Sequence, residues 1–531
     1  MVRADGREDP AGRTSVAAVL GLINLGVKTL SNAVALSLVI RFLGRDEAGL
    51  WAILQGISMY LGLTELGLGQ TVMNIVGALF ARRERQRIEE TLSTALILYI
   101  YIVTPVLLIV VIGGALLPID RIFLKSVQPD APGSLRVLFL VTATLTLVRI
   151  PLTVFPSALL GLRELAARQW YELTLALATL LATVGVLLAR GNLLALLVTT
   201  NTVSFAVMAA VYPALIRGRG FDVKVSFSRV RRELLLPFLT NSGLFFVIGL
   251  AFIVDRSAGS ILIGKFGTLG QVPVVFAMLT LFRTLGWSVV NIISSILLPY
   301  MIMYNAREQA DRVTFFALLC TKTSVLVASA LTLVVWLFAK PLFALWLGKG
   351  YEPDLTALVL LGLAFMVDSV FMTSTNFLVG LNRHRRLARA MAFKTVAVIS
   401  LGFLGAVLFV QQPVTGIIGG IAIGSVISQS LQMPAIVRRD LGLTSSQFRD
   451  QFLVRPSVVV AVPGLALGAT GFLGTSGGAS LVAVALSAMA LLLVIQWRVI
   501  YDASEREWLG SLFRRCASSV IVRVRRLPSS T

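Results

Sequence analysis

Fourteen long apolar segments run through this chain of 531 residues and limit what it can fold into. Each is close to the roughly 20 residues that a helix needs to cross the ~30 Å hydrocarbon core of a bilayer. The segments lie at residues 16–40, 49–79, 92–118, 135–160, 170–189, 193–216, 234–254, 271–300, 315–338, 355–381, 391–410, 414–436, 456–473 and 479–500. The predicted fold is an all-α polytopic membrane protein with about 14 transmembrane helices.

Positive charge alternates between the gaps that separate these segments. If the N-terminus is cytoplasmic, 31 of the 47 Lys and Arg residues lie in the tails and loops on its side. The opposite loops carry 9, and 7 lie inside segments. Because such a bias orients membrane proteins with short loops, the chain is predicted to be a multi-pass membrane protein with both termini in the cytoplasm.

Composition excludes several other classes of protein. The net charge of +21 is explained by loops that face anionic lipid, so nucleic acid is not an expected partner, whereas membrane lipids are. Two cysteines, Cys320 and Cys516, rule out a disulfide framework and a cysteine metal site. The polar N-terminus has no cleavable signal pattern. The first apolar segment is therefore expected to remain as a helix.

The motifs that enzymes need are missing from the sequence. It has no GxxxxGK[ST] loop and no GxGxxG after a strand. His384 is the single histidine and lies in the basic loop NRHRRLAR, where a solvated residue is the expected interpretation. We therefore predict no enzyme activity, no catalytic residues, no metal site and no cofactor.

Weak internal similarity indicates two related halves. LLGL at 159–162 matches LVGL at 378–381, and RFLG at 41–44 matches GKFG at 264–267. Both offsets link a segment to the sixth one after it, which predicts two six-helix bundles related by a pseudo-twofold axis along the membrane normal. The predicted organisation is a cytoplasmic N-terminal tail at 1–15, an N-terminal bundle at 16–216, a basic linker at 217–233, a C-terminal bundle at 234–436, a loop with two extra helices at 437–500 and a basic cytoplasmic tail at 501–531.

Charged residues inside the apolar segments are the candidate functional residues. An ionisable group at the centre of a membrane helix costs about 2.5–3.5 kcal/mol, so such groups are expected to face a wet cavity or one another. The excess of cations predicts that Lys28, Arg149, Arg283 and Lys322 bind a phosphate or diphosphate. The alternative is structural ion pairing, for example Arg149 with Asp368 or Glu65 with Lys28.

Two further groups of polar residues complete the predicted site. Acids between helices can exchange a proton or bind a sodium ion, and the candidates for such H⁺ or Na⁺ coupling are Glu65, Asp255 and Asp368. Amides that can line a sugar path, or hold helices together, are Asn24, Asn32, Gln70, Asn74, Asn241, Asn291 and Asn376.

The run RFLGRDEAGLWAILQGISMYLGLTELGLGQTVMNIVG at 41–77 resembles the signature of the oligosaccharide flippases. These belong to the multidrug/oligosaccharidyl-lipid/polysaccharide exporter superfamily. Similar stretches are AFIVDRSAGSILIGKFG at 251–267, LLPYMIMYNAREQADR at 297–312 and PLFALWLGKGYEP at 341–353. The sequence departs from the family pattern after the seventh segment, where Pro273 and Val274-Val275 replace the usual Gly-x-Tyr turn.

The resemblance implies two six-helix bundles around a V-shaped cavity, with two extra C-terminal helices. It also implies that the protein flips a lipid-diphosphate-linked oligosaccharide outward across the plasma (inner) membrane by alternating access, for cell-surface polysaccharide assembly. A polysaccharide polymerase and glycosyltransferases are then expected partners. The alternatives are a lipid II flippase or a drug/cation antiporter of the same superfamily and, from a different class, a non-transporting membrane scaffold.

Overall fold

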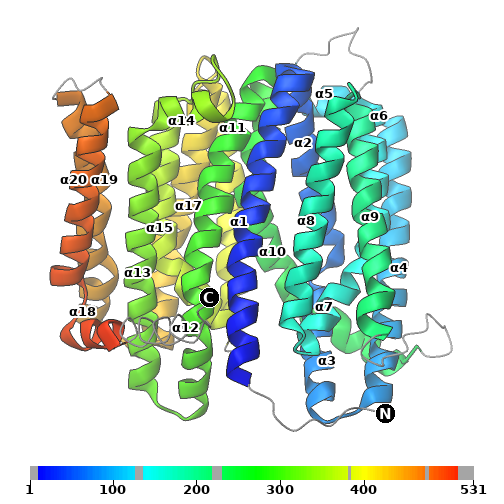
Figure 1. Cartoon of the computed structure of the whole chain (residues 1–531), viewed down its shortest axis with the longest axis horizontal. Helices are drawn as coiled ribbons and strands as arrows, with labels where there is room; N and C mark the ends of the chain where they lie inside the picture. Colours follow the sequence, from blue (N-terminus) through cyan, green and yellow to red (C-terminus); the bar gives the residue numbers. More distant parts are fainter. Residues whose placement is uncertain (1–9, 126–134, 218–229, 381–383, 473–477, 512–531) are drawn as a thin grey trace, which may run out of the picture. The chain divides into compact units, whose positions relative to one another are not determined.

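The computed structural model describes residues 10–125, 135–217, 230–380, 384–472 and 478–511, which form helices joined by short connections (Figure 1). Among these residues, thirteen helices are long and apolar enough to cross a membrane, and no strand occurs. The predicted all-α polytopic fold is confirmed. Of the predicted basic tail at 501–531, residues 512–531 lie outside the described residues, and Cys516 is among them.

The chain divides into two compact units. The first comprises residues 1–285, 340–360 and 384–425, and the second comprises residues 286–339, 361–383 and 426–531. Helices of the first unit are α1 (Pro10–Leu43), α2 (Arg45–Gly62), α3 (Leu68–Ala81), α4 (Arg85–Leu116), α5 (Ile119–Phe123), α6 (Leu135–Arg149), α7 (Val154–Gly161), α8 (Leu165–Leu188), α9 (Leu193–Arg217), α10 (Arg232–Phe266), α11 (Val272–Leu279), α14 (Ala339–Trp346) and α16 (His384–Leu408).

The second unit is built around α13. Its helices are α12 (Trp287–Ala306), α13 (Ala310–Leu337), α18 (Ser445–Phe448), α19 (Arg455–Phe472) and α20 (Gly478–Ile495). Helix α13 packs against α12, α19 and α20. Helices α15 (Leu355–Gly380) and α17 (Pro413–Asp440) are each divided between the two units.

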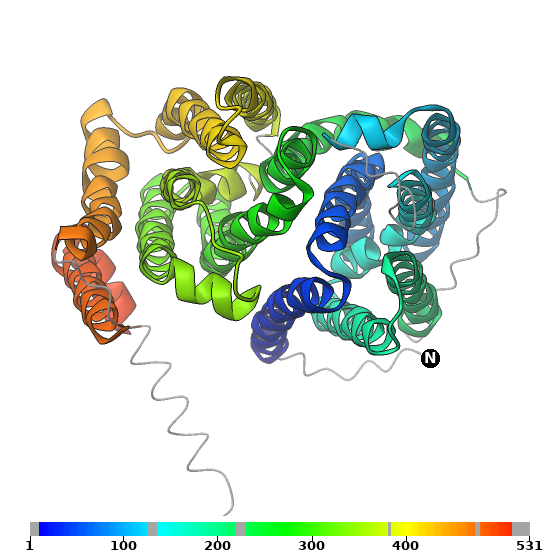
Figure 2. The ribbon, with the colours of Figure 1, turned by 90° about the horizontal axis from the view of Figure 1, so that it is seen from above.

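A ring of five helices forms the N-terminal part of the first unit. Helix α1 packs on α8, α8 on α9, α9 on α6, α6 on α2, and α2 on α1, as the view from above shows (Figure 2). Helices α3, α4 and α7 pack together beside this ring around a buried apolar core that includes Leu68, Tyr99 and Phe155. The ring therefore encloses the interior in which polar residues can gather.

The second predicted segment, 49–79, is not one helix. Helix α2 ends at Gly62, a short 3₁₀ turn (η1, Leu63–Glu65) follows, and α3 begins at Leu68. Leu66 and Gly67 join them in the left-handed region, with φ of 51° and 72°. Glycine adopts this conformation at little cost, whereas leucine does not. The chain is thus interrupted beside Glu65, in the middle of the expected span.

Two other predicted segments are also interrupted beside a charged residue. In the fourth segment, α6 ends at Arg149 and the turn η2 (Ile150–Thr153) follows. The helix stops there because Pro151 lacks the N–H that a continuous helix needs. The eighth contains a π-helical turn, η5 (Thr280–Gly286), with Arg283 inside it. Turns η1 and η2 pack against each other.

The junction with the unusual Pro273 is a well-formed helix start. Thr268 and Gln271 make a capping box, in which the Thr268 backbone N–H donates to Gln271 Oε1 over 3.0 Å. Pro273 then lies in the first turn of α11, where a missing N–H costs nothing. The departure from the family pattern therefore leaves the connection intact.

Candidate functional site

A polar pocket of about 210 Å³ lies inside the five-helix ring. Eleven of its sixteen lining residues are polar, and none is Asp or Glu. The polar residues are Ser31, Asn32, Gln55, Ser58, Thr142, Arg149, Thr179, Thr183, Thr200, Asn201 and Ser204. Arg149 is the only charged residue among them, so the pocket carries a single positive charge.

The helix ends and the side-chain spacing explain how this pocket forms. Arg149 is the last residue of α6, and the Pro151 turn ends the helix there. The hydroxyls of Thr183, Thr200 and Ser204 donate to carbonyl oxygens one turn back in their own helices. Their lone pairs remain available as acceptors. The pocket can therefore bind an anion at Arg149 and accept hydrogen bonds from a hydroxyl-bearing ligand.

Lys28 is paired with an acid that the sequence analysis did not single out. Its ammonium bonds the Glu172 carboxylate, which also accepts from Arg168 Nε at 2.7 Å. Asn24 Nδ2 joins this network by donating to Gln169 Oε1 at 2.7 Å. Lys28 is thus ion-paired, as the alternative interpretation had it, but with Glu172 rather than Glu65, because α1 packs on α8.

Glu65 instead belongs to the break between α2 and α3. The Tyr99 hydroxyl donates to its carboxylate over 3.2 Å. A Cβ on Gly69 would lie only 2.3 Å from Glu65 Oε1 and 2.6 Å from Ser157 Oγ. The absence of a side chain at Gly69 thus lets the carboxylate turn toward the start of α3. An acid at a helix break remains a candidate for ion coupling, and that role stays a prediction.

Asp255 and Arg283, predicted to have separate roles, are ion-paired. Arg283 Nη1 lies 3.1 Å from Asp255 Oδ2, and Lys394 Nζ lies 3.2 Å from the same oxygen. All three side chains are almost completely buried. Arg256 Nε donates to the Arg283 carbonyl oxygen inside the π-helical turn. The cluster holds two cations around one carboxylate, a geometry that joins α10, η5 and α16.

Lys322 lies in the second unit and is ion-paired with two acids from the segment that follows α20, a cluster called the Lys322 clamp below. Its ammonium donates to both oxygens of Glu505, at 3.0 and 2.8 Å, and to Asp502 Oδ2 at 3.0 Å. These bonds use all three donors of an ammonium group. Gln496 also donates to the Lys322 carbonyl oxygen. The partners of Lys322 are thus carboxylates of the protein and not the expected diphosphate. In this geometry Lys322 has a structural role.

The remaining predicted residues are spread over both units. Asn376 Nδ2 donates to Asn291 Oδ1 at 2.8 Å, which ties α15 to α12. Asp368 is buried in the second unit. Asn32 lines the Arg149 pocket, whereas Asn74 and the half-buried Gln70 lie on α3. The Asn241 side chain lies outside the described residues.

Several residues that complete these clusters were missed in the sequence. Glu172 and Lys394 lie within three residues of the predicted segment ends, where a charge is normally solvated. Gln55 and Ser58, and Asn201 and Ser204, are each three apart and so share one face of a helix. That spacing, repeated on several helices, was the available signal for the pocket.

No family model and no curated protein matches the sequence. Solved structures do match this chain in fold. The chain superposes on an inward-facing multidrug resistance MATE family transporter of the MOP superfamily with a TM-score of 0.64 and 16% identity, over 81% of this chain and 99% of that one. It has the fold of the MOP superfamily.

Two other structures with the MOP fold extend the comparison. The lipid II flippase MurJ, in an inward closed conformation, gives a TM-score of 0.68 at 11% identity and covers 90% of this chain and 99% of its own. A MOP superfamily transporter from Pyrococcus furiosus is described as having a binding pocket of reversed polarity. It gives a TM-score of 0.58 at 17% identity and covers 82% of this chain and 98% of its own. At these identities the likeness concerns the MOP fold, which is the fold implied by the resemblance at 41–77.

Proposed function

We propose that this multi-pass membrane protein is a transporter that flips a lipid-diphosphate-linked oligosaccharide from the cytoplasmic to the outer leaflet of the plasma membrane. The observation that carries the proposal is the Arg149 pocket, which combines one guanidinium with hydroxyls and amides and has no acid in its lining. A guanidinium binds phosphate in a bidentate geometry, in which two of its N–H groups donate to two phosphate oxygens. The hydroxyl lone pairs nearby suit the first sugar.

The polarity of the pocket argues against a cationic substrate. A drug cation would meet Arg149 with no carboxylate to balance it, which is unfavourable in a site of low dielectric. The partly exposed Glu172 and the buried Asp255 are already paired with cations. An antiporter for cationic drugs is therefore the weaker candidate.

A lipid II flippase is the second candidate. The specific observation in its favour is the match to MurJ, which covers 90% of this chain against 81% for the MATE structure. Both candidates move a polyprenyl-diphosphate sugar and differ only in the glycan. Complementation of a strain depleted of its lipid II flippase separates them: rescue supports lipid II, and failure with normal protein level supports another oligosaccharide.

Replacement of Arg149 tests the proposal. Arg149→Ala is expected to slow flipping about 10- to 100-fold, the equivalent of the ~1.5–3 kcal/mol of a charged hydrogen bond, while Arg149→Lys retains part of the rate. The measurement is the surface exposure of lipid-linked oligosaccharide in cells, with protein level followed by immunoblot. Arg121→Ala, at an exposed arginine outside the pocket, is the matched control. Normal export by Arg149→Ala would remove the pocket from the mechanism.

Energy coupling by H⁺ or Na⁺ belongs to the same proposal. Glu65 supports it because its carboxylate lies at a helix break that packs against the Arg149 turn, so binding of an ion there can affect the pocket. Glu65→Gln keeps the hydrogen bond from Tyr99 and removes the charge. Flipping that loses its dependence on the ion gradient in this variant would support Glu65, and unchanged dependence would exclude it.

A further inference from the structure

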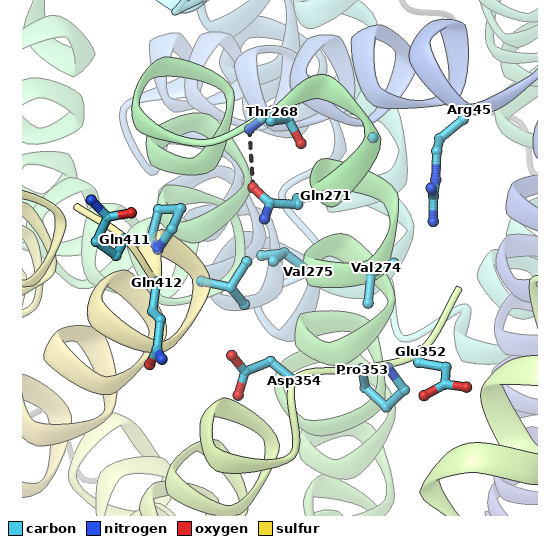
Figure 3. Close-up of a pocket in the computed structure, with 13 residues that line it drawn as sticks. Arg45, Thr268, Gln271, Val274, Val275, Glu352, Pro353, Asp354, Gln411 and Gln412 are labelled. Atoms are coloured by element: carbon cyan, nitrogen blue, oxygen red, sulfur yellow. Dashed lines mark hydrogen bonds between the residues drawn. The ribbon is translucent and has the colours of Figure 1, made fainter. Parts of the chain in front are cut away.

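A second cavity, of about 400 Å³, lies in the first unit at the end where α1 finishes (Figure 3). It is lined by four separate connections: the start of α2, the turn before α11, the loop before α15 and the turn between α16 and α17. The polar lining residues are Arg45, Thr268, Gln271, Glu352, Asp354, Gln411 and Gln412. Its volume is within the usual range for small-molecule sites, ~300–1,000 Å³.

The walls of this cavity are held by their own hydrogen bonds. Arg45 Nη2 donates to the Gly350 carbonyl oxygen at 2.7 Å, and its guanidinium lies 4.4 Å from the centre of the Tyr351 ring. A Cβ on Gly270 would come within 2.8 Å of Arg45 Cδ, so the turn and the arginine fit closely. Asp354 accepts from the Ala357 backbone N–H at 2.9 Å and caps α15. The site is therefore largely preformed.

The side chains that these bonds do not use offer both donors and acceptors. Gln411, Gln412 and Glu352 have exposed side chains, and Gln271 keeps its Nε2 donors because only its oxygen is used by the cap. Val274 and Val275 supply an apolar floor. Mixed amides and carboxylates over an apolar surface match a neutral ligand with many hydroxyls and apolar C–H faces.

This cavity differs from the Arg149 pocket in the charge of its lining. Two carboxylates and one guanidinium line it, so a diphosphate would meet a net negative surface. Among the described residues no group of three or more His, Cys, Asp or Glu could hold a metal ion, so a bridging cation is not indicated here. The amide and carboxylate groups of the lining favour a neutral, hydroxyl-rich ligand such as a saccharide over an anion.

We propose that this cavity is a saccharide-binding subsite on the outer face of the transporter, which receives the sugar part of the substrate as it leaves. The outer position follows from the Lys/Arg distribution, because all four connections belong to the loops with few positive charges. The inference rests on the proposed function. It adds a second, neutral contact for the glycan that is separate from the diphosphate site.

Saccharide binding to the full-length protein in nanodiscs tests the subsite. The probes are neutral trisaccharides of glucose, galactose, N-acetylglucosamine or rhamnose, titrated by saturation-transfer NMR. At least one should bind, and the double variant Glu352→Ala, Gln412→Ala should weaken its binding about tenfold or more, the equivalent of one or two hydrogen bonds. Lys349→Ala, in the same loop but outside the lining, is the matched control and should bind normally.

The outcomes separate the subsite from the proposed function. Binding that survives the double variant but is lost in Arg149→Ala would place the sugar in the inner pocket and overturn the subsite. Failure of every trisaccharide to bind the wild-type protein would also overturn it. If the double variant abolishes sugar binding while Arg149→Ala exports normally, the subsite stands and the diphosphate mechanism fails.

Discussion

At the scale of single residues, the candidate cations that the structure describes divide into two kinds by their contacts. Lys28, Arg283 and Lys394 each contact a carboxylate, and Lys322 contacts two. Arg149 lies in a pocket without acidic lining residues. Since a paired cation contributes to the fold and a cation in an acid-free pocket can bind an anion, the Arg149 pocket is the place where substrate charge is expected to bind.

The clamp around Lys322 gives the first prediction at this scale. Lys322→Met leaves the buried Glu505 without its cation and is expected to destabilise the protein by about 3–5 kcal/mol, since breaking one half of a buried pair is costly. The thermal midpoint of the purified protein measures the effect. Lys349→Met, at an exposed lysine, should leave the midpoint unchanged. A midpoint equal to wild type in Lys322→Met would show that the clamp contributes nothing.

Asp502 makes the same clamp sensitive to pH. Burial raises the pKa of Asp502, but hydrogen bonds from Arg455 and Lys322 outweigh it and hold the pKa below its ordinary 3.8. A lowered pKa in the folded state means that the contribution is present above pH 3.8 and is lost as the pH falls through the folded value. Asp502→Asn should therefore lower the thermal midpoint more at pH 7 than at pH 3. Equal losses at both values would contradict this assignment.

At the scale of helices, interruptions occur where charges lie. The second, fourth and eighth predicted segments are broken beside Glu65, Arg149 and Arg283. Non-helical backbone at membrane depth is tolerated only where protein or water satisfies its polar groups. Each interruption thus marks a part of the helix that faces the interior of the protein.

Gly69 and Gly62 provide a matched pair for testing the break beside Glu65. An added methyl at Gly69 would displace the ends of the Glu65 and Ser157 side chains, so Gly69→Ala is expected to break the Tyr99–Glu65 hydrogen bond and cost about 1 kcal/mol. Gly62 has no atom within 4 Å of an added Cβ and has an ordinary helical φ of −57°. Gly62→Ala should be neutral or slightly stabilising. Thermal midpoints that fall equally in both variants would show that the Glu65 contact does not matter.

The positions of the helices could be predicted from the sequence, but their neighbours could not. Length and hydropathy locate the segments, because a bilayer demands about 20 apolar residues of each one. The Lys28–Glu172 pair depends on how α1 rotates against α8, which apolar residues facing lipid do not specify. The break at Leu66 was also hidden, since leucine is an unusual residue for left-handed backbone.

At the scale of the whole molecule, the chain shares its fold with solved transporters although only 11–17% of the aligned residues are identical. The fold tolerates this divergence because few residues define it. Membrane helices need apolarity, small residues at close contacts and the right loop charges, all of which many sequences supply. Function then depends on the few polar residues inside. This is why the fold is recognisable here while the substrate must be argued from the Arg149 pocket.

The orientation of the molecule is testable with two cysteines. In a background with Cys320 and Cys516 replaced by serine, Lys349→Cys should react with an impermeant maleimide added to intact cells. Arg82→Cys, in an exposed turn between α3 and α4, should react only after lysis. The expected result follows from the excess of Lys and Arg on the cytoplasmic side. Labelling of Arg82→Cys from outside would invert the topology and place the saccharide cavity in the cytoplasm.

The Lys322 clamp also has a consequence for how the protein is made. Lys322 meets Asp502 only 180 residues further along the chain. During synthesis the ninth segment therefore enters the membrane with a cation whose partners have not yet left the ribosome, at a cost of about 2.5–3.5 kcal/mol. The insertion machinery or lipid phosphate must accommodate that charge until Asp502 and Glu505 have been synthesised.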